Sequence, residues 1–90
     1  MNLFDLSGIS LEEENFQSLL KNDQIKVERI VSKGHASPEG FWYDQNENEW
    51  VVIVQGEAEL EFEDGLIVAL RKGENFLIEK NRKHRVKSTS

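Results

Sequence analysis

Residues 57–70 read Glu-Ala-Glu-Leu-Glu-Phe-Glu-Asp-Gly-Leu-Ile-Val-Ala-Leu, and this stretch decides the fold class. Up to residue 63, glutamates alternate with Ala, Leu and Phe. Because successive side chains of a β-strand point to opposite faces, this period of two places the carboxylates on one face and the apolar side chains on the other. The stretch is predicted to be a half-exposed antiparallel strand, and the pattern excludes a helix.

The pair Asp64-Gly65 marks the end of that strand. Glycine accepts a positive φ without a Cβ clash, so this pair predicts a two-residue type I′ hairpin. The return strand is predicted at Leu66 to Leu70, and the next turn at Arg71 to Glu74.

Other short strands are predicted on both sides of this hairpin. Together with it, the predicted strands are 25–31, 50–54, 57–63, 66–70, 76–78 and 83–87. In the last of them, His84 and Val86 share one face. A loop at 34–40 holds the only proline, and a polar turn at 79–82 precedes the last strand. Six or seven short strands at this spacing argue for an antiparallel barrel or sandwich.

Residues 1–24 are predicted to form an amino-terminal segment before the barrel, and two structures are open for it. Ser10-Leu11-Glu12-Glu13 has the form of a capping box, which predicts a short helix over 11–20. In that helix Phe16, Leu19 and Leu20 would turn inward. The alternative is an edge strand through residues 16–20.

Composition restricts the chain to one domain and a few classes of partner. Ninety residues with 38% hydrophobic content suffice for one modest core. No apolar run approaches the roughly 18 residues that cross a bilayer, and the start lacks the basic region of a signal peptide, so we expect no membrane partner. The absence of cysteine fits a cytoplasmic protein. A net charge of −6 argues against nucleic acid, whose affinity for proteins comes largely from Lys and Arg.

The charges are segregated along the chain. Residues 39–64 contain nine acidic side chains and no basic one, whereas residues 71–87 contain seven basic and two acidic side chains. We expect two solvated faces of opposite sign. The alternative is that the two faces meet across a contact between subunits.

Two groups of residues have a motif-like spacing. Glu49 and Gly56 stand seven positions apart around an apolar run, and Gly73 precedes His84 across the turn that contains Asn81. In both spacings, and in the stretch Ser-Pro-Glu-Gly-Phe-Trp-Tyr-Asp-Gln at 37–45, the chain resembles the cupin superfamily. It resembles in particular small single-domain bacterial cupins, mostly without assigned function. Asn81 stands where the family has a glycine, and Asn is the residue that best replaces Gly in left-handed geometry.

The resemblance implies an all-β fold, a cupin-type double-stranded β-helix or jelly-roll barrel, over residues 25–90. Cupins of this kind normally continue past the strand of His84, so the barrel is expected to be incomplete at its carboxyl end. An open sheet edge exposes unpaired backbone groups. We expect the amino-terminal segment or a second subunit to cover that edge, and we expect a homodimer.

The resemblance also implies where a metal would bind. In metal-binding cupins, three imidazoles and one carboxylate hold a divalent ion inside the barrel. Both histidines of the first motif are replaced here, which leaves His84, Glu49 and, if the register permits, Asp44 as ligands. The ion would be Mn, Fe, Ni or Zn, with no basis for choosing among them. The alternative for His84 is a core histidine hydrogen-bonded to Glu49.

Three functions are open at this point. The first is a small-molecule-binding cupin, whose candidate ligand contacts are Trp42, Tyr43, Gln45, Val51 and Ile53. The phase of residues 42–45 is undecided, so either 42 and 44 or 43 and 45 face inward. The second is an enzyme: a metal-dependent oxygenase or isomerase, or a metal-free isomerase or epimerase of sugars or other small molecules with His84 as base and Tyr43 as acid. The third is a structural or interaction module with a filled barrel.

Overall fold

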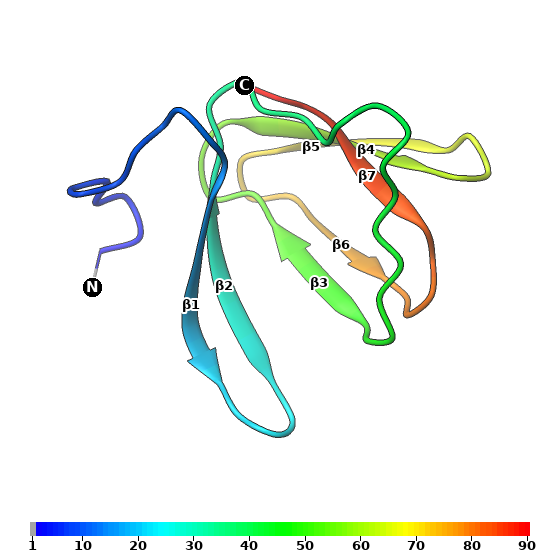
Figure 1. Cartoon of the computed structure of the whole chain (residues 1–90), viewed down its shortest axis with the longest axis horizontal. Helices are drawn as coiled ribbons and strands as arrows, with labels where there is room; N and C mark the ends of the chain where they lie inside the picture. The colour runs from blue at the N-terminus through cyan, green and yellow to red at the C-terminus, as the bar shows by residue number, and fades with distance from the viewer. Residues whose placement is uncertain (1) are drawn as a thin grey trace. The chain divides into compact units, whose positions relative to one another are not determined.

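The computed structural model describes residues 2–90, and within them it contains seven strands, all paired antiparallel, and no helix (Figure 1). In chain order the strands are β1 (Asn15–Lys21), β2 (Lys26–Val31), β3 (Glu49–Val52), β4 (Glu57–Phe62), β5 (Ile67–Arg71), β6 (Asn75–Ile78) and β7 (His84–Thr89). The predicted all-β class is confirmed. Over the same residues, no helix has the length and apolar character needed to span a membrane.

Contacts within the chain divide it into two units. The hairpin unit, up to Lys33, contains β1 and β2, and the barrel unit, Gly34–Ser90, contains β3 to β7. The barrel unit has two sheets, one with the strand order β5-β4-β7 and one that pairs β3 with β6.

β4 is the central strand of the barrel unit, and it follows the predicted alternation. Its Leu60 and Phe62 are 6% and 1% exposed, and they pack with Leu70 of β5 and Ile78 of β6. The core therefore lies between the two sheets. Its buried residues come from strands whose apolar side chains recur at every second position, as a sheet buried on one face requires.

The connection from β4 to β5 differs from the predicted type I′ hairpin. That turn needs positive φ at two successive residues, but only Gly65 of the pair has one, at 93°. The N–H of Phe62 donates to the carbonyl of Leu66 (2.9 Å), and the N–H of Gly65 donates to the carbonyl of Phe62 (2.9 Å). The loop therefore has three residues. The Asp64 carboxylate accepts a hydrogen bond from the Leu66 N–H (3.1 Å) and so holds Asp64 in an ordinary turn conformation.

The sheet of β3 and β6 has one buried and one exposed face. Glu49 lies opposite Ile78, and Trp50 lies opposite Leu77. Ile78 is 2% exposed, whereas Trp50 and Leu77 are 62% and 54% exposed. Glu49 therefore belongs to the face that looks toward the core, and the next residue along the strand belongs to an outer apolar face.

The loop that precedes β3 covers the outer edge of β7. The N–H of Ser37 donates to the carbonyl of Val86, and the N–H of Val86 donates to the hydroxyl of Ser37, both at 2.9 Å. Further along the loop, Tyr43 forms an isolated antiparallel bridge with His84. This loop of the barrel unit satisfies backbone groups of the edge strand.

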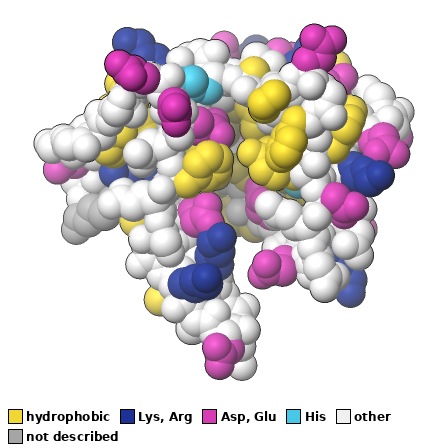
Figure 2. All heavy atoms as spheres, in the orientation of Figure 1, with side chains coloured by type: hydrophobic (Ala, Val, Ile, Leu, Met, Phe, Trp, Pro, Cys, Tyr) yellow, Lys and Arg dark blue, Asp and Glu magenta, His cyan; other side chains and the backbone are white. Residues whose placement is uncertain are grey.

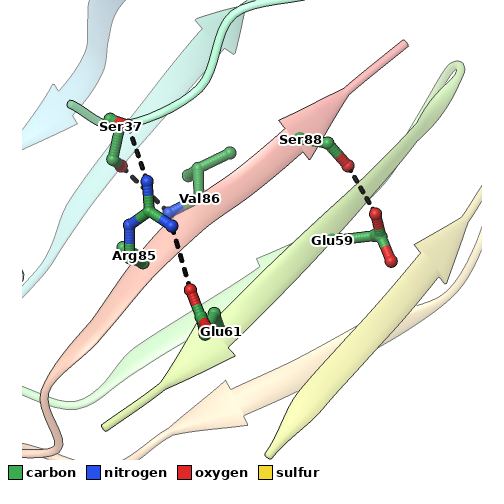
Figure 3. A network of polar contacts seen from close by, with 6 residues as sticks. All are labelled: Ser37, Glu59, Glu61, Arg85, Val86 and Ser88. Carbon is green, nitrogen blue, oxygen red and sulfur yellow. Dashed lines mark hydrogen bonds and ion pairs between the residues drawn. The ribbon is translucent and has the colours of Figure 1, made fainter. Parts of the chain in front are cut away.

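Glutamates of β4 pair with polar side chains of β7 within the chain (Figure 3). Arg85 donates from Nη1 to Glu61 Oε1 and from Nη2 to the Ser37 carbonyl, both at 2.9 Å. The Ser88 hydroxyl donates to Glu59 Oε1 (2.7 Å). The prediction of two separate solvated faces is wrong for these residues, because the register of β4 and β7 places Glu61 opposite Arg85.

The hairpin unit consists of β1 paired with β2. The strand is thus the alternative that forms, and the helix predicted over 11–20 does not. Phe16, Leu19 and Leu20 are 53%, 38% and 51% exposed rather than turned inward. A ten-residue helix is marginal in water, and cross-strand pairing with β2 satisfies the same backbone groups.

Side-chain hydrogen bonds hold the turns of the hairpin unit. Between the strands, the side-chain oxygen of Asn22 accepts from the N–H of Gln24 (2.8 Å) and of Ile25 (2.9 Å). Before β1, the Asp5 carboxylate accepts from the hydroxyl of Ser7 (2.6 Å) and from its N–H (2.9 Å). These hydrogen bonds stabilise the charged form and lower the pKa of Asp5 below its ordinary value.

Candidate functional site

His84 is the buried polar side chain of the core. It begins β7, lies opposite Phe62 and is 5% exposed. Its Nδ1 is 2.9 Å from the carbonyl oxygen of Arg82. Because a carbonyl oxygen only accepts hydrogen bonds, Nδ1 carries the proton, and Nε2 of the neutral ring keeps its lone pair. The Arg82 carbonyl, not Glu49 as the core-histidine alternative predicts, is the hydrogen-bond partner of this ring.

Tyr43 lies against His84. The N–H of Tyr43 donates to the carbonyl of His84 (2.7 Å), and the N–H of His84 donates to the carbonyl of Tyr43 (3.1 Å). The two rings are stacked, with centroids 5.6 Å apart and planes inclined by 25°. The phase of residues 42–45 is thereby decided: Tyr43 faces the histidine, Trp42 is half-buried, and Asp44 and Gln45 are exposed.

Glu49 shares the inward face of β3 with Val51. Val51 and Ile53 pack against the buried core, and Glu49 is half-buried at the start of the strand. No hydrogen bond or ion pair joins the Glu49 carboxylate to another residue within 2–90. An inward, half-buried carboxylate of this kind can accept hydrogen bonds from a bound molecule.

The three expected metal ligands are not brought together. Asp44 is exposed, Glu49 begins β3, and His84 begins β7. Throughout residues 2–90, no group of three His, Asp or Glu side chains is arranged to hold a metal ion. Since protein metal sites use at least three such ligands in most catalytic centres, the donor set of this chain does not fit a resident divalent ion.

Arg82, which the sequence predicts only as part of a polar turn, lies beside Phe62. Its guanidinium carbon lies 3.9 Å from the centroid of the Phe62 ring and 5.9 Å from that of Phe76. The Phe62 ring in turn lies 6.1 Å from the imidazole of His84. Its place in the sequence indicates why it lies near His84. Arg82 stands two residues before His84, and this spacing puts two side chains on the same face of an extended chain.

Two turns that frame this end of the barrel unit are joined by hydrogen bonds. The N–H of Asn81 donates to the carbonyl of Gln45 (2.6 Å), and the N–H of Lys80 donates to the side-chain oxygen of Asn48 (2.9 Å). Asn81 has a φ of 61°, which confirms the left-handed geometry predicted for it. Gln45 therefore contributes through its backbone carbonyl, while its side chain is exposed.

These groups form a chemically defined cluster. An imidazole in a fixed tautomer, a phenol ring stacked on it and a guanidinium over the neighbouring Phe62 ring lie together in one unit. The inward carboxylate of Glu49 lies on β3 of the same unit. A hollow of about 380 Å³ shares Phe62 and Arg82 with this group, and its other lining residues are Glu63, Asp64, Asn81 and Lys83. The cluster can accept a proton at Nε2 of His84, and it offers hydrogen-bond donors and acceptors to a polar molecule.

Comparison with known proteins agrees with the all-β fold. The family profile described as Cupin domain matches residues 28–90. A crystal structure from Ralstonia eutropha JMP134, of a protein described as a candidate mannose-6-phosphate isomerase, is 39% identical in sequence with a TM-score of 0.89. The match covers 100% of this chain and 84% of that one. No curated protein matches the chain.

Proposed function

The chain belongs to the cupin family, and on that premise we propose that it binds a small polar molecule, of sugar-like chemistry, at the cluster of His84 and Tyr43. The observation that carries the proposal is the stacked pair of these two rings, with the Nδ1 proton of His84 directed to the Arg82 carbonyl. That hydrogen bond orients the ring and reserves Nε2 for a ligand. Glu49 and the half-buried Trp42 would supply further polar and apolar contacts.

A second candidate function, isomerisation, is favoured by the likeness to the Ralstonia eutropha protein. In an aldose–ketose isomerisation, a base removes the proton from C2 while the carbonyl oxygen takes a proton, which gives an enediol. The hydroxyl at C2 then loses its proton, and C1 receives one, so no atom or electron is gained or lost overall. Nε2 of His84 would serve as the base and the Tyr43 hydroxyl as the acid. A metal ion has no part in this proposal, because the donor set does not fit one.

A titration with mannose and with mannose 6-phosphate, followed by amide chemical shifts, tests the binding proposal. We expect shifts at residues 43, 62, 76 and 84, and the same binding after treatment with a chelator. Tyr43→Phe keeps the stacked ring and removes the hydroxyl, and His84→Gln removes the imidazole. Both should weaken binding by about tenfold, the effect of one lost hydrogen bond to a polar ligand.

His35→Gln is the matched control for His84→Gln, since it removes the other histidine, which lies outside the cluster. It should leave binding unchanged. Thermal melting separates a folding defect of His84→Gln from a binding defect. If the histidine variant does not fold, Tyr43→Phe alone tests the binding site. Shifts scattered over other strands, or binding indifferent to both variants, would overturn the proposed site.

The same titration in deuterium oxide tests the isomerase candidate. Proton transfer through a base introduces solvent deuterium into the sugar next to the carbonyl. Loss of a general base typically reduces such a step by about 10²–10⁴-fold, so exchange should fall by that order in His84→Gln. If the sugar binds but takes up no deuterium from the solvent, the binding proposal stands and the isomerase candidate is excluded.

We further propose that the protein works as a homodimer through the outer face of β3 and β6. Figure 2 shows hydrophobic side chains at the molecular surface, and the pair Trp50 and Leu77 on this face is 62% and 54% exposed. Exposed apolar patches of soluble proteins commonly mark interaction sites, and an isologous contact lets one patch meet its own copy.

Sedimentation equilibrium tests the dimer. Wild type is expected to be dimeric at micromolar concentration, and Trp50→Glu should be monomeric because it would place two carboxylates in the contact. Leu66→Glu, at a residue 44% exposed in another part of the unit, is the control and should stay dimeric. A wild-type monomer, or a Trp50→Glu dimer, would refute this contact.

A further inference from the structure

Arg82 has an arrangement that is unusual for a residue of a polar turn. Its guanidinium lies over the Phe62 ring at 3.9 Å, and its side chain is only 33% exposed. Within residues 2–90 the guanidinium donates no hydrogen bond, and the nearest carboxylate oxygen, of Asp64, is 3.9 Å away. That separation is too long for a hydrogen bond. The guanidinium N–H groups of Arg82 thus lie over an aromatic ring and donate no hydrogen bond within residues 2–90.

The hollow beside Arg82 has the size and the cations for a small anionic group. Its volume of about 380 Å³ falls in the range of small-ligand sites. Lys83 lines it as a second cation. The two carboxylates in the lining, Glu63 and Asp64, have side chains 59% and 67% exposed, and their contacts with Lys83 and Arg82 measure 3.5 and 3.9 Å. Exposed pairs of this length are weak, so an incoming oxyanion can displace them.

We propose that this hollow binds the oxyanion group, a phosphate or a carboxylate, of the small molecule recognised by the barrel. Arg82 would form the bidentate contact, because a planar guanidinium matches the two oxygens of such a group. Stacking on Phe62 fixes the guanidinium before binding and so reduces the entropy lost on binding. Lys83 adds a second positive charge. The inference rests on the proposed function for the identity of the ligand, and it narrows that ligand to an anionic molecule.

The position of Arg82 links the hollow to the cluster. Its carbonyl accepts the hydrogen bond from His84, while its side chain lines the hollow. The same residue would therefore bind the anionic group of the ligand through its guanidinium and orient the imidazole of His84 through its carbonyl. This arrangement is distinct from general charge attraction, since the whole chain carries a net charge of −6 and repels anions at long range.

Isothermal titration with four probes tests the inference: inorganic phosphate, mannose 6-phosphate, gluconate and mannose. We expect mannose 6-phosphate to bind at least about tenfold more tightly than mannose, and Arg82→Gln to abolish that advantage. Arg82→Lys keeps the charge but loses the planar donors, so it should retain only part of the advantage. Asp64→Asn removes the competing carboxylate and should strengthen phosphate binding.

Lys72→Gln is the control for these variants. It makes the same change of charge as Arg82→Gln at an exposed residue outside the hollow, so it should bind every probe as wild type does.

The four probes distinguish the sources of the oxyanion and the two proposals. If gluconate binds in an Arg82-dependent way and phosphate does not bind, the oxyanion of the ligand is a carboxylate. If phosphate binds in an Arg82-dependent way and gluconate does not bind, the oxyanion is a phosphate. Mannose and mannose 6-phosphate binding equally, with Arg82→Gln indistinguishable from wild type, overturns the oxyanion site and leaves the function of the cluster intact. Mannose 6-phosphate binding that is weakened in Arg82→Gln but unaffected in Tyr43→Phe and His84→Gln supports the oxyanion site while the cluster proposal fails. Equal loss in Arg82→Gln and Lys72→Gln would mean attraction by charge alone and would also overturn the site.

Discussion

The hairpin unit and the barrel unit are both built of antiparallel strands, but they bury their side chains very differently. All five buried residues within 2–90, Leu60, Phe62, Leu70, Ile78 and His84, lie in the barrel unit. In the hairpin unit, large apolar residues such as Phe16, Leu20 and Ile30 are about half exposed. Within its own unit, the pair of β1 and β2 has no second layer of strands against which to bury a face, and a two-stranded hairpin by itself is marginally stable at best. Strand pairing and core formation are therefore separate contributions in this chain.

A matched pair of phenylalanine variants tests this contrast and should give the largest effect. Phe62→Ala removes a ring that is 1% exposed and should destabilise the protein by about 3–5 kcal/mol, as other large-to-small core changes do. Phe16→Ala removes a ring that is 53% exposed and should change stability by less than about 1 kcal/mol. Urea unfolding followed by circular dichroism measures both. Equal losses would show that the hairpin unit contains a core of its own or that Phe16 is covered in solution.

Ion pairs provide a second, smaller test of the same contrast. Glu61→Gln leaves Arg85, whose side chain is 17% exposed, without its charged partner, and should cost about 1–2 kcal/mol. Glu28→Gln breaks the pair with Lys26, whose side chain is 50% exposed, and should cost less than about 0.5 kcal/mol. The same denaturation measurement applies, repeated at high salt. If Glu61→Gln cost no more stability than Glu28→Gln, the hydrogen bonds in Figure 3 would not contribute to holding the loop of Ser37 on β7.

Much of the barrel unit could be predicted because the order of residues within each strand indicates that strand without information from distant parts of the chain. The alternating glutamates of β4 predicted both the strand and its buried residues, and Asn81 predicted its own left-handed geometry. The capping box at Ser10 failed as a predictor because it describes only the first turn of a helix. Whether a helix continues depends on a surface that buries its apolar stripe. Likewise Asp64-Gly65 predicted a turn correctly but not its length, which follows from the pairing of Phe62 with Leu66.

The candidate site was predictable only in part. His84 was predicted to face the barrel interior, and it does. Its relation to Tyr43 could not be predicted, because a turn at 45–48 interrupts the period of two and alternation cannot be carried across it. The contact of Arg82 with Phe62 joins residues twenty positions apart on different elements, and no local pattern reports such a contact. The exposure of Asp44 could likewise not be predicted from a local pattern.

By itself, the sequence determined the all-β class, the family and the places of most strands, because these depend on side-chain alternation and on turn residues that act over a few positions. The tertiary structure decided which charges pair, which residue of 42–45 meets the histidine, and which cation lies on the aromatic core. These outcomes depend on the register between distant strands. A shift of one residue in that register would exchange the buried and exposed faces of a strand while leaving its sequence unchanged.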